Sequence, residues 1–198
     1  QITGKDNQIS IKDILIGDVW LCSGQSNMQW VVNNVTNAEV EKKNANYSQI
    51  RTLNIPRRME LSPKDTISTT WLVCSPETVG RFSGVAYFFA RKVYEETNIP
   101  IGIINSSWGG TIVETWTSLE AANTLPQKRL DRYNKNEKLS PPTEYFTRTN
   151  KEAKRNDYPS LVYNAMIHPL LSFAIKGVVW YQGENNVGTV SYTHLTLP

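Results

Sequence analysis

Three apolar segments of this 198-residue chain each run directly into a short segment rich in glycine and polar residues. The first, Val19–Cys22, precedes GQSNM at 24–28; the second, IGII, precedes NSSWGGT at 105–111; the third, Ala174–Tyr181, precedes QGENN at 182–186. A short, continuously apolar run predicts a strand buried on both faces, and such strands are typical of parallel sheets. In an open parallel sheet the carboxyl ends of the strands share one edge, where ligands bind. We therefore expect the three polar segments to meet at that edge.

Helical periodicity appears between these strands. Apolar residues recur at helical spacing from Phe82 to Glu96 and again from Ser160 to Leu171. Ser75-Pro76-Glu77 has the signature of a helix N-terminus, a capping serine followed by proline in the first turn. Two shorter strand-like runs, around 51–55 and 69–73, lie between the first and second apolar strands. The alternation predicts an α/β fold built from βαβ units.

The composition is that of a folded protein, with 39% hydrophobic and 20% charged residues. The net charge of +3 is spread without a basic stripe, so we expect no nucleic-acid interface. No run reaches the roughly 18 apolar residues that cross a bilayer, so we expect no membrane span. Cys22 and Cys74 are too few for a disulfide framework or a metal site, and we expect two buried apolar side chains.

Each polar segment supplies a different part of an acyl-transfer site. GQSNM contains a hydroxyl nucleophile, Ser26, and NSSWGGT contains Gly109 and Gly110, whose backbone N–H groups can face an oxyanion. QGENN adds polar side chains that can donate or orient. Taken alone, the serine is typical of a turn or a helix cap, and the glycine pair of an ordinary turn. Their combination at one sheet edge favours catalysis over both alternatives.

Four longer segments carry a resemblance to a known family. DVWLCSGQSNMQW, VCSPETVGRFSGVAYFFAR, GIINSSWGGTIVETW and YNAMIHPLLSFAIKGVVWYQGENN, in this order, resemble the sialate O-acetylesterase family of the SGNH hydrolase superfamily. The resemblance covers most of residues 8–188 and thins in a polar surface insertion at about 121–157. It implies a three-layer, flavodoxin-like α/β fold with a mostly parallel sheet that is incomplete at the C-terminus.

The resemblance also implies a role for each candidate site residue. Ser26 is the expected nucleophile, and its own N–H is expected to form part of the oxyanion hole. Gly109 or Gly110 would supply a second N–H, with the choice between them open, and the side-chain amide of Gln182 a third donor. Glu184 would be the carboxylate that orients a catalytic histidine. Glu114 and Trp116 also match the family pattern, but spacing does not separate substrate contact from packing, and packing is favoured for Trp116.

A serine hydroxyl needs a base, and neither histidine of the chain fits that role well. His168 precedes the QGENN segment, whereas the catalytic histidine of the family follows it, so we expect a hydrogen-bonded structural residue. His194 lies in a tail, 189–198, that does not match the family and that we expect to be artefactual. The expected base therefore lies beyond the chain, and 16–188 would be a partial esterase domain. We expect residues 1–15 to end a preceding β-rich region, with the native N-terminus missing.

The expected function is hydrolysis of O-acetyl groups on sialic acid or another acetylated carbohydrate, through an acetyl-enzyme and without a metal or organic cofactor. The family resemblance implies a secreted or periplasmic protein. One alternative is a carbohydrate-binding module or inactive fragment without turnover, and another is a chain that does not fold stably because a sheet edge is exposed. Without its base, the chain is expected to be at least about a thousandfold slower than its parent enzyme.

Overall fold

The computed structural model describes residues 2–125, 139, 141 and 158–187. The strands are β1 (Ile2–Thr3), β2 (Gln8–Ile9), β3 (Asp18–Gly24), β4 (Tyr47–Asn54), β5 (Trp71–Cys74), β6 (Ile101–Ser107) and β7 (Gly177–Tyr181). The α-helices are α1 (Ser26–Gln29), α2 (Ala38–Asn44), α3 (Gly84–Thr97) and α4 (Leu119–Ala122). Shorter helical turns are η1 (Val32–Asn34), η2 (Val79–Arg81), η3 (Val113–Trp116), η4 (Tyr163–Ile167), η5 (His168–Leu170) and η6 (Glu184–Asn186).

Five strands form the main sheet, in the order β5-β4-β6-β3-β7. β3 pairs in parallel with both β6 and β7, and β4 pairs in parallel with β6, while β5 is antiparallel to β4. In this register Gly24, the last residue of β3, lies opposite Ser107 at the end of β6 and Tyr181 at the end of β7. The three strands therefore end in line, as the sequence predicted.

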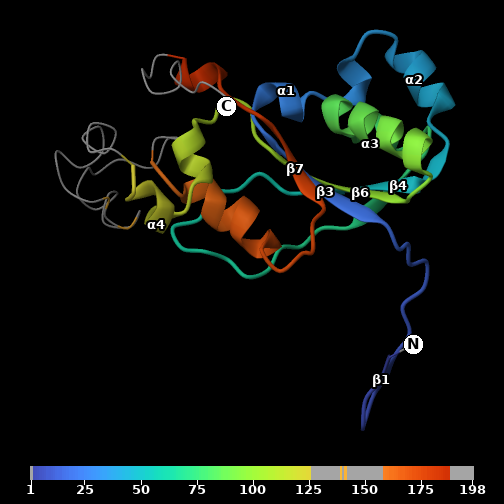
Figure 1. Cartoon of the computed structure of the whole chain (residues 1–198), viewed down its shortest axis with the longest axis horizontal. Coiled ribbons are helices and arrows are strands. Elements are labelled where there is room, and N and C mark those ends of the chain that lie inside the picture. Colours follow the sequence, from blue (N-terminus) through green and yellow to red (C-terminus); the bar gives the residue numbers. More distant parts are fainter. Residues whose placement is uncertain (1, 126–138, 140, 142–157, 188–198) are drawn as a thin grey trace.

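The sheet lies between two helical layers (Figure 1). α2 and α3 cover one face, and the segment from 161 to 170 lies on the other with α4. Buried residues form one core under α3 and a second between the sheet and the 161–170 segment. The predicted three-layer α/β fold with a mostly parallel sheet is confirmed.

β3 occupies the point where the chain changes direction across the sheet. The connection from β3 leads to β4 on one side, while β7, the last strand, pairs with the other side of β3. Open α/β sheets bind ligands in the crevice at such a switch point, beyond the carboxyl ends of the strands. The fold therefore places the GQSNM segment where a binding site is expected.

β7 differs from the buried strand that its apolar sequence predicted. Val178 is 54% exposed and Trp180 42% exposed, because among the described strands β7 is the last in the sheet order and pairs with β3 alone. One face of β7 does pack inward, since Val179 contacts the core under α3. Burial on both faces was wrong for this strand, because apolar sequence shows what a strand can bury but not how many neighbours it has.

The predicted helix start at Ser75-Pro76-Glu77 was also wrong. These residues form a turn in which Ser75 Oγ donates to Glu77 Oε2, and α3 begins only at Gly84. The 3₁₀ turn η2 follows, and the chain is then extended at Phe82 and Ser83, where the N–H of Val32 donates to the carbonyl of Phe82 and Ser83 pairs with Val31 in an isolated β-bridge. Pairing with the segment after α1 thus delays the helix.

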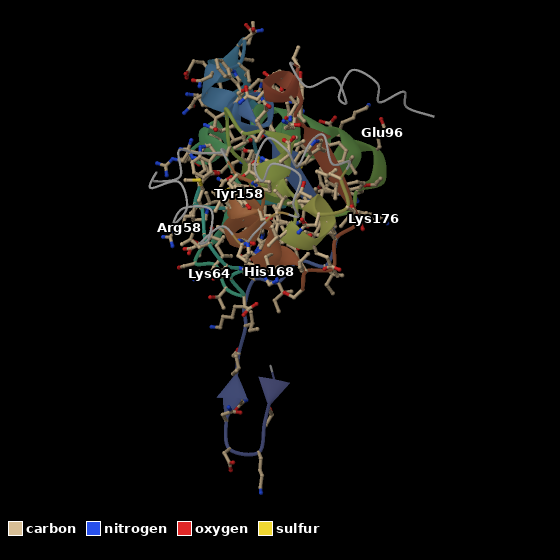
Figure 2. The ribbon with its side chains drawn as sticks, turned by 90° about the vertical axis from the view of Figure 1, so that its left-hand side faces the viewer. Arg58, Lys64, Glu96, Tyr158, His168 and Lys176 are labelled. Atoms are coloured by element: carbon tan, nitrogen blue, oxygen red, sulfur yellow. The ribbon has the colours of Figure 1, made fainter. Side chains whose placement is uncertain are left out.

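Other predicted elements have mixed outcomes. The predicted helix near 160–171 is present but irregular, with a π-helical turn in η4 followed by the 3₁₀ turn η5. Most of the predicted insertion at 121–157 and all of the tail at 189–198 lie outside the described residues. At the other end, β1 and β2 form a separate hairpin that extends away from the main body in both views (Figures 1 and 2).

The two cysteines are free and buried, as predicted. Burial raises the pKa of the Cys22 thiol to about 12 and the pKa of Cys74 to about 11, so both remain protonated and apolar at neutral pH. No helix within the described ranges is long and apolar enough to cross a membrane. The described residues also hold no cluster of three His, Cys, Asp or Glu side chains placed to bind a metal ion.

Candidate active site

Ser26 is the first residue of α1 and lies immediately beyond the end of β3. The turn between them is tight: Gly24 has φ of +140°, and a Cβ at this position would lie 2.0 Å from the carbonyl oxygen of Tyr181. Only glycine fits such a close approach of two strands. The turn exposes the Ser26 side chain, whose Oγ forms no hydrogen bond within the described part of the chain. The hydroxyl is therefore open to a ligand.

Gly109 packs directly against Ser26. A Cβ on Gly109 would lie 3.4 Å from both Cα and Cβ of Ser26, so the NSSWGGT turn touches the turn that carries Ser26. The N–H of Gly109 donates to Gln29 Oε1 at 2.5 Å. Gly110 follows with φ of +78°, a left-handed conformation that favours glycine. The structure thus brings Gly109 into contact with Ser26, and Gly110 is the next residue of the same turn.

Gln182 belongs to the same edge but faces inward. Its Nε2 donates to Asn186 Oδ1 at 2.6 Å, to Gln25 Oε1 at 3.2 Å and to the carbonyl of Thr111 at 3.3 Å. These partners are buried, and the amide therefore joins the loops after β3, β6 and β7. Its role as an oxyanion donor stays a prediction, and this geometry directs its protons to protein acceptors.

Glu184 lies on the exposed side of the same loop. Asn27, the neighbour of Ser26, donates from Nδ2 to Glu184 Oε1. This contact places a solvent-accessible carboxylate beside the turn that carries Ser26. A carboxylate in this position can accept a hydrogen bond from the N–H of a histidine base that reaches Ser26, and so hold that base in orientation.

The two residues whose roles sequence left open are both buried. Trp116 packs in the core, with its ring edge-on to that of Trp180 at a centroid distance of 5.9 Å, and it donates from Nε1 to Thr111 Oγ1. The predicted packing role of Trp116 is therefore confirmed. Glu114 is 4% exposed and accepts a hydrogen bond from Asn186 Nδ2 at 2.9 Å. The Glu114 carboxylate is thus a buried anchor for the loop that carries Glu184, rather than a group open to substrate.

Neither histidine meets Ser26 in the described structure. The Nδ1 atom of His168 lies 2.9 Å from the carbonyl oxygen of Lys64, and its ring contacts Tyr163 edge-on. Figure 2 shows His168 beside Lys64, on the side of the body from which the N-terminal hairpin extends. His168 is therefore a hydrogen-bonded structural residue, as expected, and His194 lies outside the described residues.

Sequence patterns missed three residues that organise this site: Gln25, Gln29 and Asn186. Each is an uncharged amide that has at least one partner far away in the sequence, so neither periodicity nor charge indicates it. The available signal was the pair of glutamines around the serine in GQSNMQ. Together, the described groups form an exposed hydroxyl, a glycine turn and a carboxylate at one edge, which suits attack on an ester.

Comparisons with known proteins point in one direction. Residues 16–194 match the family described as "Carbohydrate esterase, sialic acid-specific acetylesterase". Sialate O-acetylesterase from Rattus norvegicus is 35% identical over an alignment of 205 positions, and the alignment covers 90% of this chain and 37% of the rat protein. The Homo sapiens protein of the same name is 38% identical over an alignment of 191 positions, which covers 90% of this chain and 33% of the human protein.

A solved structure is similar as well. The crystal structure of a novel carbohydrate acetylesterase from Xanthomonas citri superposes with a TM-score of 0.72 at 34% identity, covering 93% of this chain and 36% of the other. The chain therefore spans about a third of the length of these relatives.

Proposed function

The chain belongs to the carbohydrate esterase family of sialic acid-specific acetylesterases, and on that premise we propose that it acts in the hydrolysis of O-acetyl groups on carbohydrates. The observation that carries the proposal is the exposed Ser26 hydroxyl, which lies against Gly109 and beside Glu184 at the shared edge of β3, β6 and β7. The name sialate O-acetylesterase, carried by several relatives, supports acetylated sialic acid as the substrate of this chain. The description of the Xanthomonas citri protein as a carbohydrate acetylesterase supports a wider range of acetylated sugars.

In this mechanism Ser26 Oγ attacks the acetyl carbonyl while a base takes the hydroxyl proton. A C–O bond forms to Ser26, the carbonyl oxygen gains negative charge, and the sugar hydroxyl leaves with the proton as the tetrahedral intermediate collapses. Water then attacks the acetyl-serine and releases acetate. Glu184 orients the base, which we place outside the described residues because His168 binds Lys64.

Backbone N–H groups stabilise the oxyanion in this proposal. The N–H of Ser26 lies at the start of α1, and the neighbouring glycine turn supplies a second donor. Either Gly109 or Gly110 supplies this donor, and in the described structure the Gly109 N–H donates to Gln29 Oε1. Gln182 contributes chiefly by holding the three loops together, since its amide protons point to buried acceptors.

Replacing the nucleophile tests the proposal. In the complete protein we expect Ser26→Ala to lower acetate release from O-acetylated sialic acid and from acetylated xylan by at least about a thousandfold. Mass spectrometry after incubation with p-nitrophenyl acetate should find an acetyl group on Ser26 of the unsubstituted protein. Ser62→Ala, at an exposed serine in the β4–β5 connection, is the control and should remain fully active.

A second candidate function is carbohydrate binding without turnover. It is favoured by the lack of a base hydrogen-bonded to Ser26 within the described residues. Binding of acetylated sugars with no acetate release from the complete protein, and no acetylation of Ser26, would replace the esterase proposal with this one.

A further inference from the structure

Two glutamines flank Ser26 in the sequence, and each reaches a different neighbouring loop. Gln25 directly precedes Ser26 and contacts the loop after β7. Gln29 lies three residues after Ser26, at the end of α1, and contacts the turn after β6. The nucleophile turn is thus connected on both sides to the two loops that complete the proposed site.

Gln25 accepts three hydrogen bonds from the loop that carries Glu184. Its Oε1 lies 3.2 Å from Gln182 Nε2, 3.5 Å from the backbone nitrogen of Gly183 and 3.4 Å from that of Asn185. Two of these donors are the backbone N–H groups on either side of Glu184. One buried oxygen, on a side chain 1% exposed, therefore sets the position of Glu184 relative to Ser26.

The position of Gln25 is itself fixed by buried partners. Its backbone N–H donates to the carbonyl of Tyr181 at 2.9 Å, which ties it to the end of β7. Its side-chain partner Gln182 is bound to Asn186, and Asn186 donates to the buried carboxylate of Glu114. A buried polar network of this kind is rigid when its members are satisfied, because each lost hydrogen bond leaves a costly buried group.

Gln29 connects the opposite loop. Its Oε1 accepts the N–H of Gly109 at 2.5 Å, and Gly109 in turn packs against Cα and Cβ of Ser26. The N–H of Trp108, one residue earlier, donates to the carbonyl of Gly24 at 3.0 Å. The glycine turn is therefore held at two successive residues by the segment that carries the nucleophile.

We propose that Gln25 and Gln29 are positioning residues, which hold the Glu184 loop and the Gly109–Gly110 turn in register with Ser26. This inference rests on the esterase function proposed above. Acyl transfer depends on the reacting groups being placed to within about 1 Å, and a displacement of that size can cost on the order of a hundredfold in rate. Neither glutamine needs to touch the substrate for this effect.

Methionine substitutions remove the acceptor oxygen while keeping side-chain length. For both Gln25→Met and Gln29→Met we expect kcat on p-nitrophenyl acetate to fall by about 10- to 100-fold in the complete protein, with KM changed by less than about twofold. Gln25→Glu and Gln29→Glu keep an oxygen that accepts the same N–H groups, so their loss of kcat should be clearly smaller. If Gln25→Met does not fold, Gln25→Glu and Gln29→Met still test the proposal.

Amide hydrogen exchange locates each effect without relying on turnover. Gln29→Met should speed exchange at the Gly109 N–H, and Gln25→Met at Gly183 and Asn185, because each amide loses its acceptor. The control is Asn164→Ala, which removes another buried amide, one that donates to the carbonyl of Glu60 in a different loop. It should lower the Tm and leave kcat unchanged.

The outcomes separate this inference from the proposed function. Faster exchange at the expected amides with unchanged kcat would overturn the positioning role and leave the esterase standing, as would an equal kcat loss in Asn164→Ala. Activity that survives Ser26→Ala would overturn the esterase proposal whatever the exchange pattern.

Discussion

Gly109 shows how little space the site leaves around the nucleophile. A Cβ here would lie 3.2 Å from Gln29 Oε1 and 3.4 Å from Cα of Ser26, yet the backbone does not need a left-handed conformation at this residue. We therefore expect Gly109→Ala to fold with a Tm within a few degrees of the unsubstituted protein. Activity should fall by at least about tenfold, because the added methyl group displaces Ser26. Thermal unfolding and kcat on p-nitrophenyl acetate measure the two effects.

The matched comparison is Gly24→Ala on the same edge. There the new Cβ would lie 2.0 Å from a backbone oxygen of β7, so folding should fail or the Tm should drop sharply before activity can be compared. Full activity of Gly109→Ala would show that the glycine turn has more freedom around Ser26 than the structure indicates.

At the residue scale, sequence identified the groups that meet but not the contacts that place them. Ser26, Gly109 and Glu184 follow apolar strands, so their shared edge could be predicted from the strand pattern. The Gln182 amide contacts Gln25 and Thr111, which are both more than 70 residues away, and no local pattern encodes these contacts. The catalytic roles themselves stay predictions.

At the scale of elements, apolar runs predicted the positions of the strands more accurately than they predicted which neighbours each strand has. β6 spans Ile101–Ser107 as predicted, because it lies inside the sheet and its sequence reflects burial on both faces. β7 was placed correctly but lies at the edge, and edge position depends on strand order rather than on sequence. The apolar run from Phe82 to Glu96 predicted α3, which spans Gly84–Thr97, but the helix N-terminus indicated at Ser75 is absent. Ser83 pairs with Val31 in a bridge just before the helix begins.

The true start of α3 gives a prediction at this scale. Ser83 Oγ accepts the N–H of Ala86 at 3.2 Å and donates to Met28 Sδ, so it caps α3 and contacts α1. Ser83→Ala should lower the free energy of unfolding by about 1 kcal/mol, as measured by urea denaturation. Ser118→Ala removes the equivalent cap from the four-residue helix α4 and should cost less, because that bond is exposed. Equal losses would mean that the Ser83 cap adds nothing specific to α3.

At the scale of the whole molecule, the described sheet ends in two edge strands. Among the described strands, the antiparallel strand β5 is bound by β4 alone and β7 by β3 alone. The surface at β7 includes Val178, Trp180 and Tyr181, with exposures of 54%, 42% and 44%. A sheet edge that presents free backbone groups and apolar side chains is prone to pair with another copy.

We therefore expect the 198-residue chain to self-associate through β7, since its net charge of +3 provides little repulsion between copies. Val178→Lys places a charge on this edge, where pairing with a second chain would bury it, and should keep the protein monomeric at concentrations where the unsubstituted chain associates. Size-exclusion chromatography with light scattering measures the mass. Val40→Lys, at a 58% exposed valine on α2, is the matched control, because it adds the same charge away from any sheet edge. If Val40→Lys suppresses association equally, net charge rather than the β7 edge controls it; if the unsubstituted chain is monomeric throughout, the edge is not a pairing surface.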